Sequence, residues 1–344
     1  MKSMTSQTVF IHTESDDPHA DSVARCLREL DVPVETLRRE RCFLDWTIDC
    51  VGDHVWISKG DQAWHQAQIA AVYWRRDFLT EPAWVQHPHL PAEAIAFIAD
   101  QRSMHVESAF KRLATDRPFF NSISANRLAS SKVLQHHVAR QCGLLVPETF
   151  IGSDPTRALG FAQHLWTGGR RCCTKNLESV HVRFNGEAKA RLTQIFEPEQ
   201  AEELAGLSVC PMIFQEYVEK VCEYRVTIVG SEVYACRIDS QSAGGETAID
   251  WRNYNIPRTP HHAVELPTCL SRKLTALVQE LGLVYGAVDL VENIDHEILF
   301  LEVNSMGQWL WIEDLTGLPI SQAIARHLAE AKHLSGPSRE AGCL

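Results

Sequence analysis

The sequence has no long apolar run and no signal-peptide pattern. None of its hydrophobic stretches approaches the roughly 18 residues that a membrane-spanning helix requires, and the N-terminus lacks the apolar core of a secretory signal. We therefore expect a cytoplasmic protein with no membrane partner. Its eleven cysteines include no C-x-x-C pair, which argues against a zinc ribbon and against a disulfide framework. Reduced thiols are the expected state.

Positive charge is also scarce. The chain of 344 residues carries 33 Lys and Arg against 44 Asp and Glu, so its formal net charge is -11. A protein that binds nucleic acid through the phosphates needs a basic surface, so we expect no nucleic-acid partner. A hydrophobic fraction of 45% and a charged fraction of 22% are typical of a globular protein that can bury a large core.

A glycine-rich phosphate loop is missing after the first predicted strand, TVFIHT, which argues against a dinucleotide site there. Apolar spacing predicts a helix from His19 to Leu30 and then the strand VPVETL, so residues 1–119 are expected to form an α/β domain. One helix is expected from Ser124 to Cys142, with Ser124 near its N-cap. Helices and strands continue to alternate, which predicts an α/β (α+β) fold with a second α+β region and a frayed tail at 335–344.

The stretch from Gly282 to Trp311 is predicted to be a β-hairpin followed by a distinctive tail. Two apolar segments flank a polar turn, and a turn centred between Asp295 and His296 would place Asp289 opposite Glu302. Side chains alternate along a strand, so Asn304 shares the face of Glu302. Buried carboxylates need a neutralising partner, and an all-oxygen set suits Mg²⁺. A solvated, exposed sheet face is the alternative for each of these residues taken singly.

Other chemistry-bearing residues occur in a definite order before the hairpin. Lys132 lies in a predicted helix, and Lys175 ends the predicted strand RRCCTK. The segment QEYVEKVCEYR then contains Glu216 and, after a loop, Glu223 and Arg225. Taken alone, each lysine is more often a solvated charge than a ligand.

The ordered set resembles the ATP-grasp superfamily over roughly residues 120–332, with an N-terminal pre-ATP-grasp α/β domain before it. In that family two α+β subdomains hold ATP between them, and the resemblance implies that they comprise residues 120–214, which include the central subdomain, and residues 215–334. The resemblance implies that ATP phosphates bind Lys132 and Lys175, that the adenine lies at Glu216, Tyr217 and Val218, and that the ribose binds Glu223. It also implies Mg²⁺ at Asp289, Glu302 and Asn304. The segment after Lys175 differs from the family pattern, because it contains a single glycine where a glycine-rich flap is usual.

A narrower resemblance comes from the segments RIDSQ, AIDWRNYN and GQWLWIE…TGLPI, and from YWRR in the N-terminal region. These segments are similar to the graspetide (microviridin-type) ligases that mature ribosomally made peptides. Members of that group usually carry proline after the Glu-x-Asn motif, whereas this chain has Ser305 and Met306 there.

The narrower resemblance implies a reaction and a partner. ATP would activate side-chain carboxylates of a precursor peptide as acyl phosphates, and a Ser, Thr or Lys of the same peptide would close an ester or amide ring. The partner would carry a leader and an acidic core that contains Ser, Thr or Lys, and a homodimer is expected from family behaviour. Arg225 and Arg252 are the candidate catalytic cations, because a guanidinium matches a carboxylate or an acyl phosphate. Two alternatives stay open: an amino-acid ligase of the glutathione-synthetase or glutamate-adding type, and a non-catalytic ATP-binding module.

Overall fold

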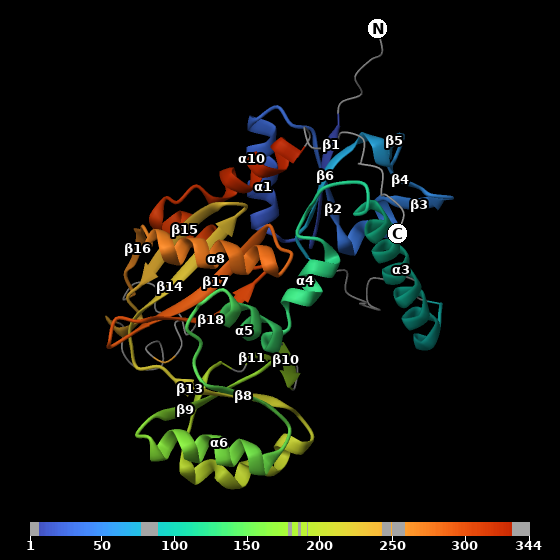
Figure 1. Cartoon of the computed structure of the whole chain (residues 1–344). Helices are drawn as coiled ribbons and strands as arrows, with labels where there is room; N and C mark the ends of the chain where they lie inside the picture. Colours follow the sequence, from blue (N-terminus) through green and yellow to red (C-terminus); the bar gives the residue numbers. More distant parts are fainter. Residues whose placement is uncertain are drawn as a thin grey trace, which may run out of the picture.

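The computed structural model describes residues 7–76, 89–177, 181–184, 187–190, 192–242, 249 and 259–331. The fold is of the α/β class and contains several sheets (Figure 1), as predicted. Arg252 and residues 335–344 lie outside the described residues. None of the helices in the described ranges has the length and apolar character that crossing a membrane demands.

The N-terminal unit is built on a parallel sheet with the strand order β2-β1-β6-β7. Its strands are β1 (Thr8–Thr13), β2 (Val34–Arg38), β6 (Ile69–Trp74) and β7 (Phe119–Phe120). Every residue of β1 and β6 is buried, as is usual for the inner strands of a parallel sheet that is covered on both faces. The helices are α1 (Pro18–Glu29), the short α2 (Cys42–Asp45) and α3 (Ala92–Leu113), and β3 (Thr47–Val51), β4 (His54–Lys59) and β5 (Gln62–His65) form a separate antiparallel sheet.

The single helix predicted from Ser124 to Cys142 is wrong. The structure contains α4 (Ile123–Ala129) and α5 (Lys132–Gln141), which are capped by Ser122 and Ser131. The Ser131 side chain accepts a hydrogen bond from the N–H of Leu134, so a new helix begins there and the preceding one ends at Ala129. This break makes Lys132 the first residue of α5.

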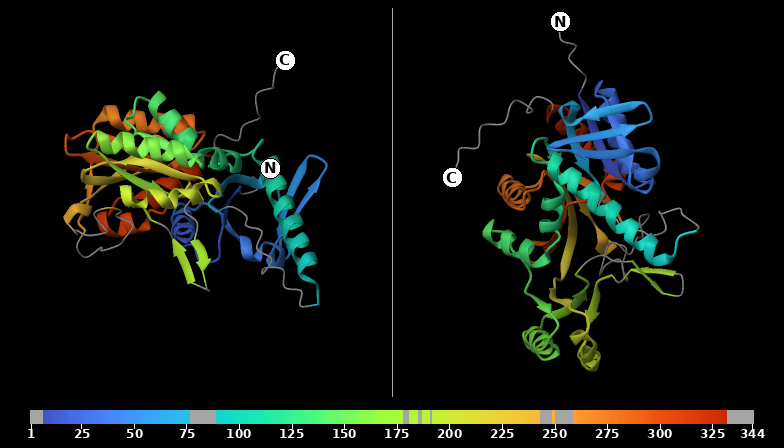
Figure 2. Two further views of the ribbon diagram at one scale, coloured as in Figure 1. Left: turned by 90° about the horizontal axis from the view of Figure 1, so that it is seen from below. Right: turned by 90° about the vertical axis from the view of Figure 1, so that its right-hand side faces the viewer.

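A four-stranded antiparallel sheet with the order β12-β9-β13-β8 forms the next unit, at the end of the molecule far from α3 (Figure 1). Its elements are β8 (Thr149–Gly152), α6 (Pro155–Thr167), β9 (Arg171–Lys175), β12 (Gln194–Phe196), the 3₁₀ segment η4 (Pro198–Ser208) and β13 (Met212–Tyr217). The hairpin of β10 (His181–Phe184) and β11 (Glu187–Ala190) projects beyond this sheet (Figure 2).

The C-terminal part contains a five-stranded antiparallel sheet with the order β16-β15-β14-β17-β18. Its elements are β14 (Lys220–Val229), β15 (Glu232–Ile238), β16 (His261–Val264), α8 (Thr268–Glu280), β17 (Tyr285–Asn293), β18 (Ile298–Asn304), α9 (Leu310–Thr316) and α10 (Ile320–Glu330). One face packs on α4, α5 and α8. The other face shares a core with α9, α10, α1 and strand β1, so the N-terminal unit and this sheet are packed together.

Asn121 fastens the N-terminal unit to the central hairpin. Its Nδ2 donates to the carbonyls of Tyr285 and Ser305 at 2.8 and 2.9 Å. Its Oδ1 accepts from the N–H groups of Val284 and Tyr285 at 2.8 and 2.9 Å. The side chain is buried, and φ is 56°, a left-handed conformation that asparagine adopts more readily than most residues.

Replacing this side chain should therefore destabilise the protein. We expect Asn121→Ala to lower the free energy of unfolding by about 3 kcal/mol, because buried backbone groups lose their partners. Asn121→Gly removes the left-handed strain but restores no hydrogen bond, so it should recover only about 1 kcal/mol of that loss. Denaturant unfolding measures both changes, with Gln279→Ala on the exposed side of α8 as a neutral control. A loss for Asn121→Ala no larger than the control would contradict this role.

Candidate active site

A cavity of about 580 Å³ lies between the antiparallel sheet β12-β9-β13-β8 and the five-stranded sheet. Its wall combines residues from separate parts of the chain: Arg76, Asn126, Lys132, His136, Lys175, Glu216, Glu223, Asp289, Glu302 and Asn304. Cationic, acidic and amide side chains that are far apart in the sequence therefore face one space. Nine of the eleven residues nominated from the sequence line this cavity. Of the other two, Arg225 is not part of the described lining, and Arg252 lies outside the described residues.

The predicted pairing of Asp289 with Glu302 is confirmed, although by a different route. The turn is centred on Asp295, because Asn293 and Glu297 face each other across it. A β-bulge then adds Leu301 to β18 between the pairs Leu290–Phe300 and Asp289–Glu302. The extra residue restores the predicted register, and Asn304 lies opposite Ala287 on the same face.

Both carboxylates of the hairpin are paired with cations of the protein. Arg225 Nη1 donates to Asp289 Oδ1 at 2.8 Å, and both side chains are buried. Lys132 Nζ, at the start of α5, donates to Glu302 Oε2 at 2.6 Å. Burial lowers the pKa of Arg225, but the adjacent Asp289 carboxylate offsets this effect and the net pKa is raised. The described residues contain no group of three His, Cys, Asp or Glu placed to hold a metal, so the oxygen set here is two carboxylates and one amide.

One end of the cavity is formed by strand β13 and the segment that follows it. Lys175 ends β9 and donates to Gln215 Oε1 at 2.8 Å, which places its ammonium beside β13. Glu216 lies 3.3 Å from Arg170, and the Tyr217 ring lies under Arg171 at 4.9 Å. Burial raises the pKa of Tyr217 to about 12, so its hydroxyl stays protonated at neutral pH. Val218 also lines this end.

Glu223 is held in the cavity wall by a lysine that the sequence analysis did not nominate. Lys220 Nζ donates to Glu223 Oε1 at 2.6 Å and to the carbonyl of Ile249 at 2.9 Å. Both side chains of the pair are almost fully buried. The spacing of three residues spans a bulge between Lys220 and Cys222, so period-two alternation along a strand gave no sign of this contact.

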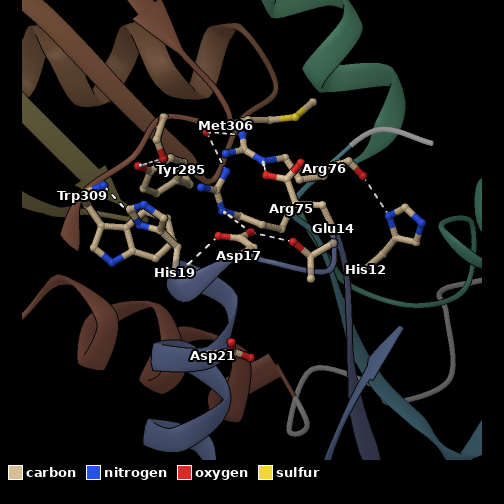
Figure 3. Close-up of polar contacts among 12 residues, drawn as sticks. His12, Glu14, Asp17, His19, Asp21, Arg75, Arg76, Tyr285, Met306 and Trp309 are labelled. Carbon is tan, nitrogen blue, oxygen red and sulfur yellow. Dashed lines mark hydrogen bonds and ion pairs between the residues drawn. The ribbon is translucent and has the colours of Figure 1, made fainter. Parts of the chain in front are cut away.

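The segment after β18, from Ser305 to Gln308, has four consecutive carbonyls that each accept a hydrogen bond from a side chain. Asn121 donates to Ser305 at 2.9 Å, and Tyr285 Oη donates to Gly307 at 3.0 Å. Arg75 and Arg76 both donate to Met306, at 2.6 and 3.1 Å, as Figure 3 shows. Arg225 Nη2 approaches the Gln308 carbonyl at 3.4 Å. We call this segment the clamped loop.

Arg225 and Arg252 differ from the other nominated residues. Arg225 is absent from the described lining of the cavity, because its side chain lies behind Asp289 and against Gly307. Arg252 lies outside the described residues.

His136, which sequence reasoning passed over, lines the cavity, and burial lowers its pKa to about 4. It is therefore neutral at pH 7.

Comparison with known proteins identifies the fold. No family model and no curated protein matches the chain. Among solved structures, the macrocyclase MdnC of Microcystis aeruginosa, bound with the precursor peptide MdnA, has 27% identity and a TM-score of 0.81 over 94% of this chain and 99% of that one.

A ligase of Chryseobacterium gregarium that is associated with ribosomally made, post-translationally modified peptides (RiPPs) was solved with ADP, a leader and a core peptide. It has 24% identity and a TM-score of 0.84 over 94% of this chain and 97% of that one. The D-cycloserine synthetase DcsG has 16% identity and a TM-score of 0.58. These matches confirm the predicted resemblance: the chain has the fold of the ATP-grasp ligases and is similar to the macrocyclases and ligases of RiPP maturation.

Proposed function

We propose that this ligase uses ATP and Mg²⁺ to activate side-chain carboxylates of a ribosomal precursor peptide and to close ester or amide cross-links within it. The observation that carries the proposal is the cavity, in which two lysines and an all-oxygen set from one hairpin face the same space. The likeness to MdnC, which was solved with a precursor peptide, supports the substrate class. A leader peptide, an acidic core and a homodimer belong to the same proposal.

The nucleotide would lie along the cavity from β13 toward the hairpin. Glu216, Tyr217 and Val218 line the end that suits the adenine, and Glu223, fixed by Lys220, suits the ribose hydroxyls. Lys132 and Lys175 would bind the phosphates, since an ammonium donates several hydrogen bonds to an oxyanion. In this arrangement Lys132 moves part of its hydrogen bonding from Glu302 to phosphate.

The residues of the hairpin fit Mg²⁺. Asp289, Glu302 and Asn304 supply carboxylate and amide oxygens, which are the ligands that this hard cation prefers, and phosphate oxygens commonly complete its shell. When bound, the ion would neutralise charge on the phosphates during transfer. Arg225 pairs with Asp289 and orients its carboxylate, so it acts as a positioning residue. Arg252 is retained as a candidate contact to the substrate.

The chemistry has two steps. A carboxylate oxygen of the peptide attacks the γ-phosphorus of ATP, ADP leaves, and an acyl phosphate forms. A hydroxyl or amine of the same peptide then attacks the acyl carbon, loses its proton and releases inorganic phosphate. Fixed cations stabilise the negative charge that develops in both steps, and the cavity supplies them from Lys132 and Lys175.

The direct test is mass spectrometry of a precursor peptide encoded beside this chain, incubated with the enzyme, ATP and Mg²⁺. We expect the peptide to lose the mass of one water for each ring and ADP to appear in equal amount. If the acceptor instead gains the mass of an added amino acid, the result would favour a ligase of the glutathione-synthetase type. An unchanged peptide alongside ATP turnover would refute the proposed substrate.

Glu302→Ala tests the metal role. We expect product formation to fall at least about a hundredfold, because a direct ligand of the ion is lost. The melting temperature should change little, since Glu302 and its partner Lys132 are both partly exposed. Glu280→Ala at the exposed end of α8 removes the same charge outside the site and serves as the control. Equal activity of the Glu302→Ala and wild-type enzymes would exclude the assigned role.

Gly307→Ala tests whether the clamped loop positions Arg225. A methyl group at Gly307 would overlap Ala287 Cβ and lie 2.7 Å from Arg225 Nη2, so the loop or the guanidinium must move. We expect a loss of about 1–3 kcal/mol in stability and at least about a tenfold loss of kcat. Gly160→Ala in α6 places the added carbon more than 4 Å from every atom outside the adjoining backbone of its own helix, so it should be neutral or slightly stabilising. Calorimetry measures the change in stability, and steady-state kinetics measures the change in kcat. Activity of the Gly307 variant within twofold of wild type would contradict the positioning role of the clamped loop.

A further inference from the structure

Two adjacent arginines at the end of β6 have different environments. The Arg75 side chain is fully buried: its Nε lies 3.4 Å from Asp17 Oδ2, and its guanidinium lies 5.1 Å from the centre of the Trp309 ring. With its bond to the Met306 carbonyl, Arg75 joins the N-terminal unit to the clamped loop (Figure 3). These contacts give Arg75 a structural role.

Arg76, in contrast, lines the cavity. Its Nε donates to Glu14 Oε1 at 3.0 Å and its Nη1 donates to the Met306 carbonyl at 3.1 Å. The remaining terminal nitrogen, Nη2, has no hydrogen-bond partner among the described residues and is not one of the buried atoms. Burial and the neighbouring Arg75 lower the pKa of Arg76, but an arginine stays charged at neutral pH. One cationic N–H donor group therefore remains available to a ligand.

The backbone of Arg76 is fixed as well. Its N–H lies 3.3 Å from the carbonyl of His12, and the Nδ1 of His12 donates to the carbonyl of Arg76 at 2.8 Å. Burial lowers the pKa of His12 to about 3, so the ring is neutral and its Nδ1 carries the proton. The ring also stacks on Trp74, with centroids 3.9 Å apart. Because these contacts already hold Arg76 in place, it loses less conformational entropy when a ligand binds than an exposed arginine would.

The position of Arg76 along the cavity indicates its ligand. On β17, Val291 lies opposite Glu223, Asp289 opposite Glu302, and Ala287 opposite Asn304. Met306, which Arg76 contacts, follows two residues after Asn304. With the adenine at β13 and the phosphates at the hairpin oxygens, Arg76 lies beyond the terminal phosphate. The group that attacks that phosphate must lie there.

We propose that Arg76 binds the reacting side-chain carboxylate of the peptide, and afterwards the acyl phosphate, through Nη2. This inference rests on the proposed function and adds to it a substrate contact made by the N-terminal unit. A planar guanidinium suits a carboxylate or phosphate better than an ammonium does, because its donors are fixed in one plane. Glu14 and Met306 orient the group and leave that one nitrogen for the substrate.

A double-mutant cycle tests the contact. The probe is the precursor peptide encoded beside this chain, and its partner is the same peptide with the reacting Glu or Asp replaced by the amide. Fluorescence anisotropy measures their affinities for the wild-type and Arg76→Gln enzymes with ADP and Mg²⁺ present. We expect the amide to weaken binding to wild type by about tenfold and to change binding to Arg76→Gln by less than about twofold.

Controls separate this contact from a structural role. Arg127→Gln removes another cavity-lining arginine, which is paired with Glu107 at 2.7 Å, and should keep the full tenfold difference between the peptides. Affinity for ADP should be unchanged in the Arg76→Gln and Arg76→Lys enzymes, and Arg76→Lys should recover only part of the peptide discrimination. Equal discrimination by wild type and Arg76→Gln, or a parallel loss of ADP affinity, would overturn the inference. Failure of the wild-type enzyme to bind or modify either peptide would instead overturn the proposed function, and this contact with it.

Discussion

The hydrogen bonds to the four carbonyls of the clamped loop are the constraint on which the site depends. Buried carbonyls without partners are costly, and here side chains of β14, β17, the β7–α4 junction and the end of β6 satisfy them. The loop joins Asn304, the last of the three proposed metal ligands of the hairpin, to Trp309 at the start of α9. The hairpin oxygens consequently take their positions from the N-terminal unit as well as from their own sheet.

The acids of the cavity wall are partly or largely removed from water, and each has a cationic partner. The carboxylates of Asp289 and Glu302 face Arg225 and Lys132, and Glu223 faces Lys220. Each pair offsets the cost of removing the acid from water, although such pairs add little net stability. Their value lies in orientation, because a carboxylate with a fixed cation on one oxygen presents a defined direction to the cavity.

Local sequence pattern was sufficient for most elements and for the hairpin register. Alternation and turn residues placed Asp289 opposite Glu302, although the turn centre was misjudged and the bulge at Leu301 compensated. The helix break before Lys132 was missed because two serines can cap a new helix as readily as they can sit within one. The contact of Arg75 with Met306 joins residues 231 positions apart, and no periodicity reports such a pair. The binding and catalytic roles that the ATP-grasp resemblance implies remain predictions for each residue.

The bulge at Leu301 also bears on how this gene can change. With Leu301 deleted, the extra residue would be gone, and regular pairing would still set Phe300 against Leu290 and Glu302 against Asp289. Insertion of one codon between the turn and Glu302 has no such compensation, because a shift of one residue would carry Glu302 and Asn304 to the opposite face. Length variation among descendants of this gene is therefore expected as loss of the bulge residue rather than as further insertions between the turn and Glu302.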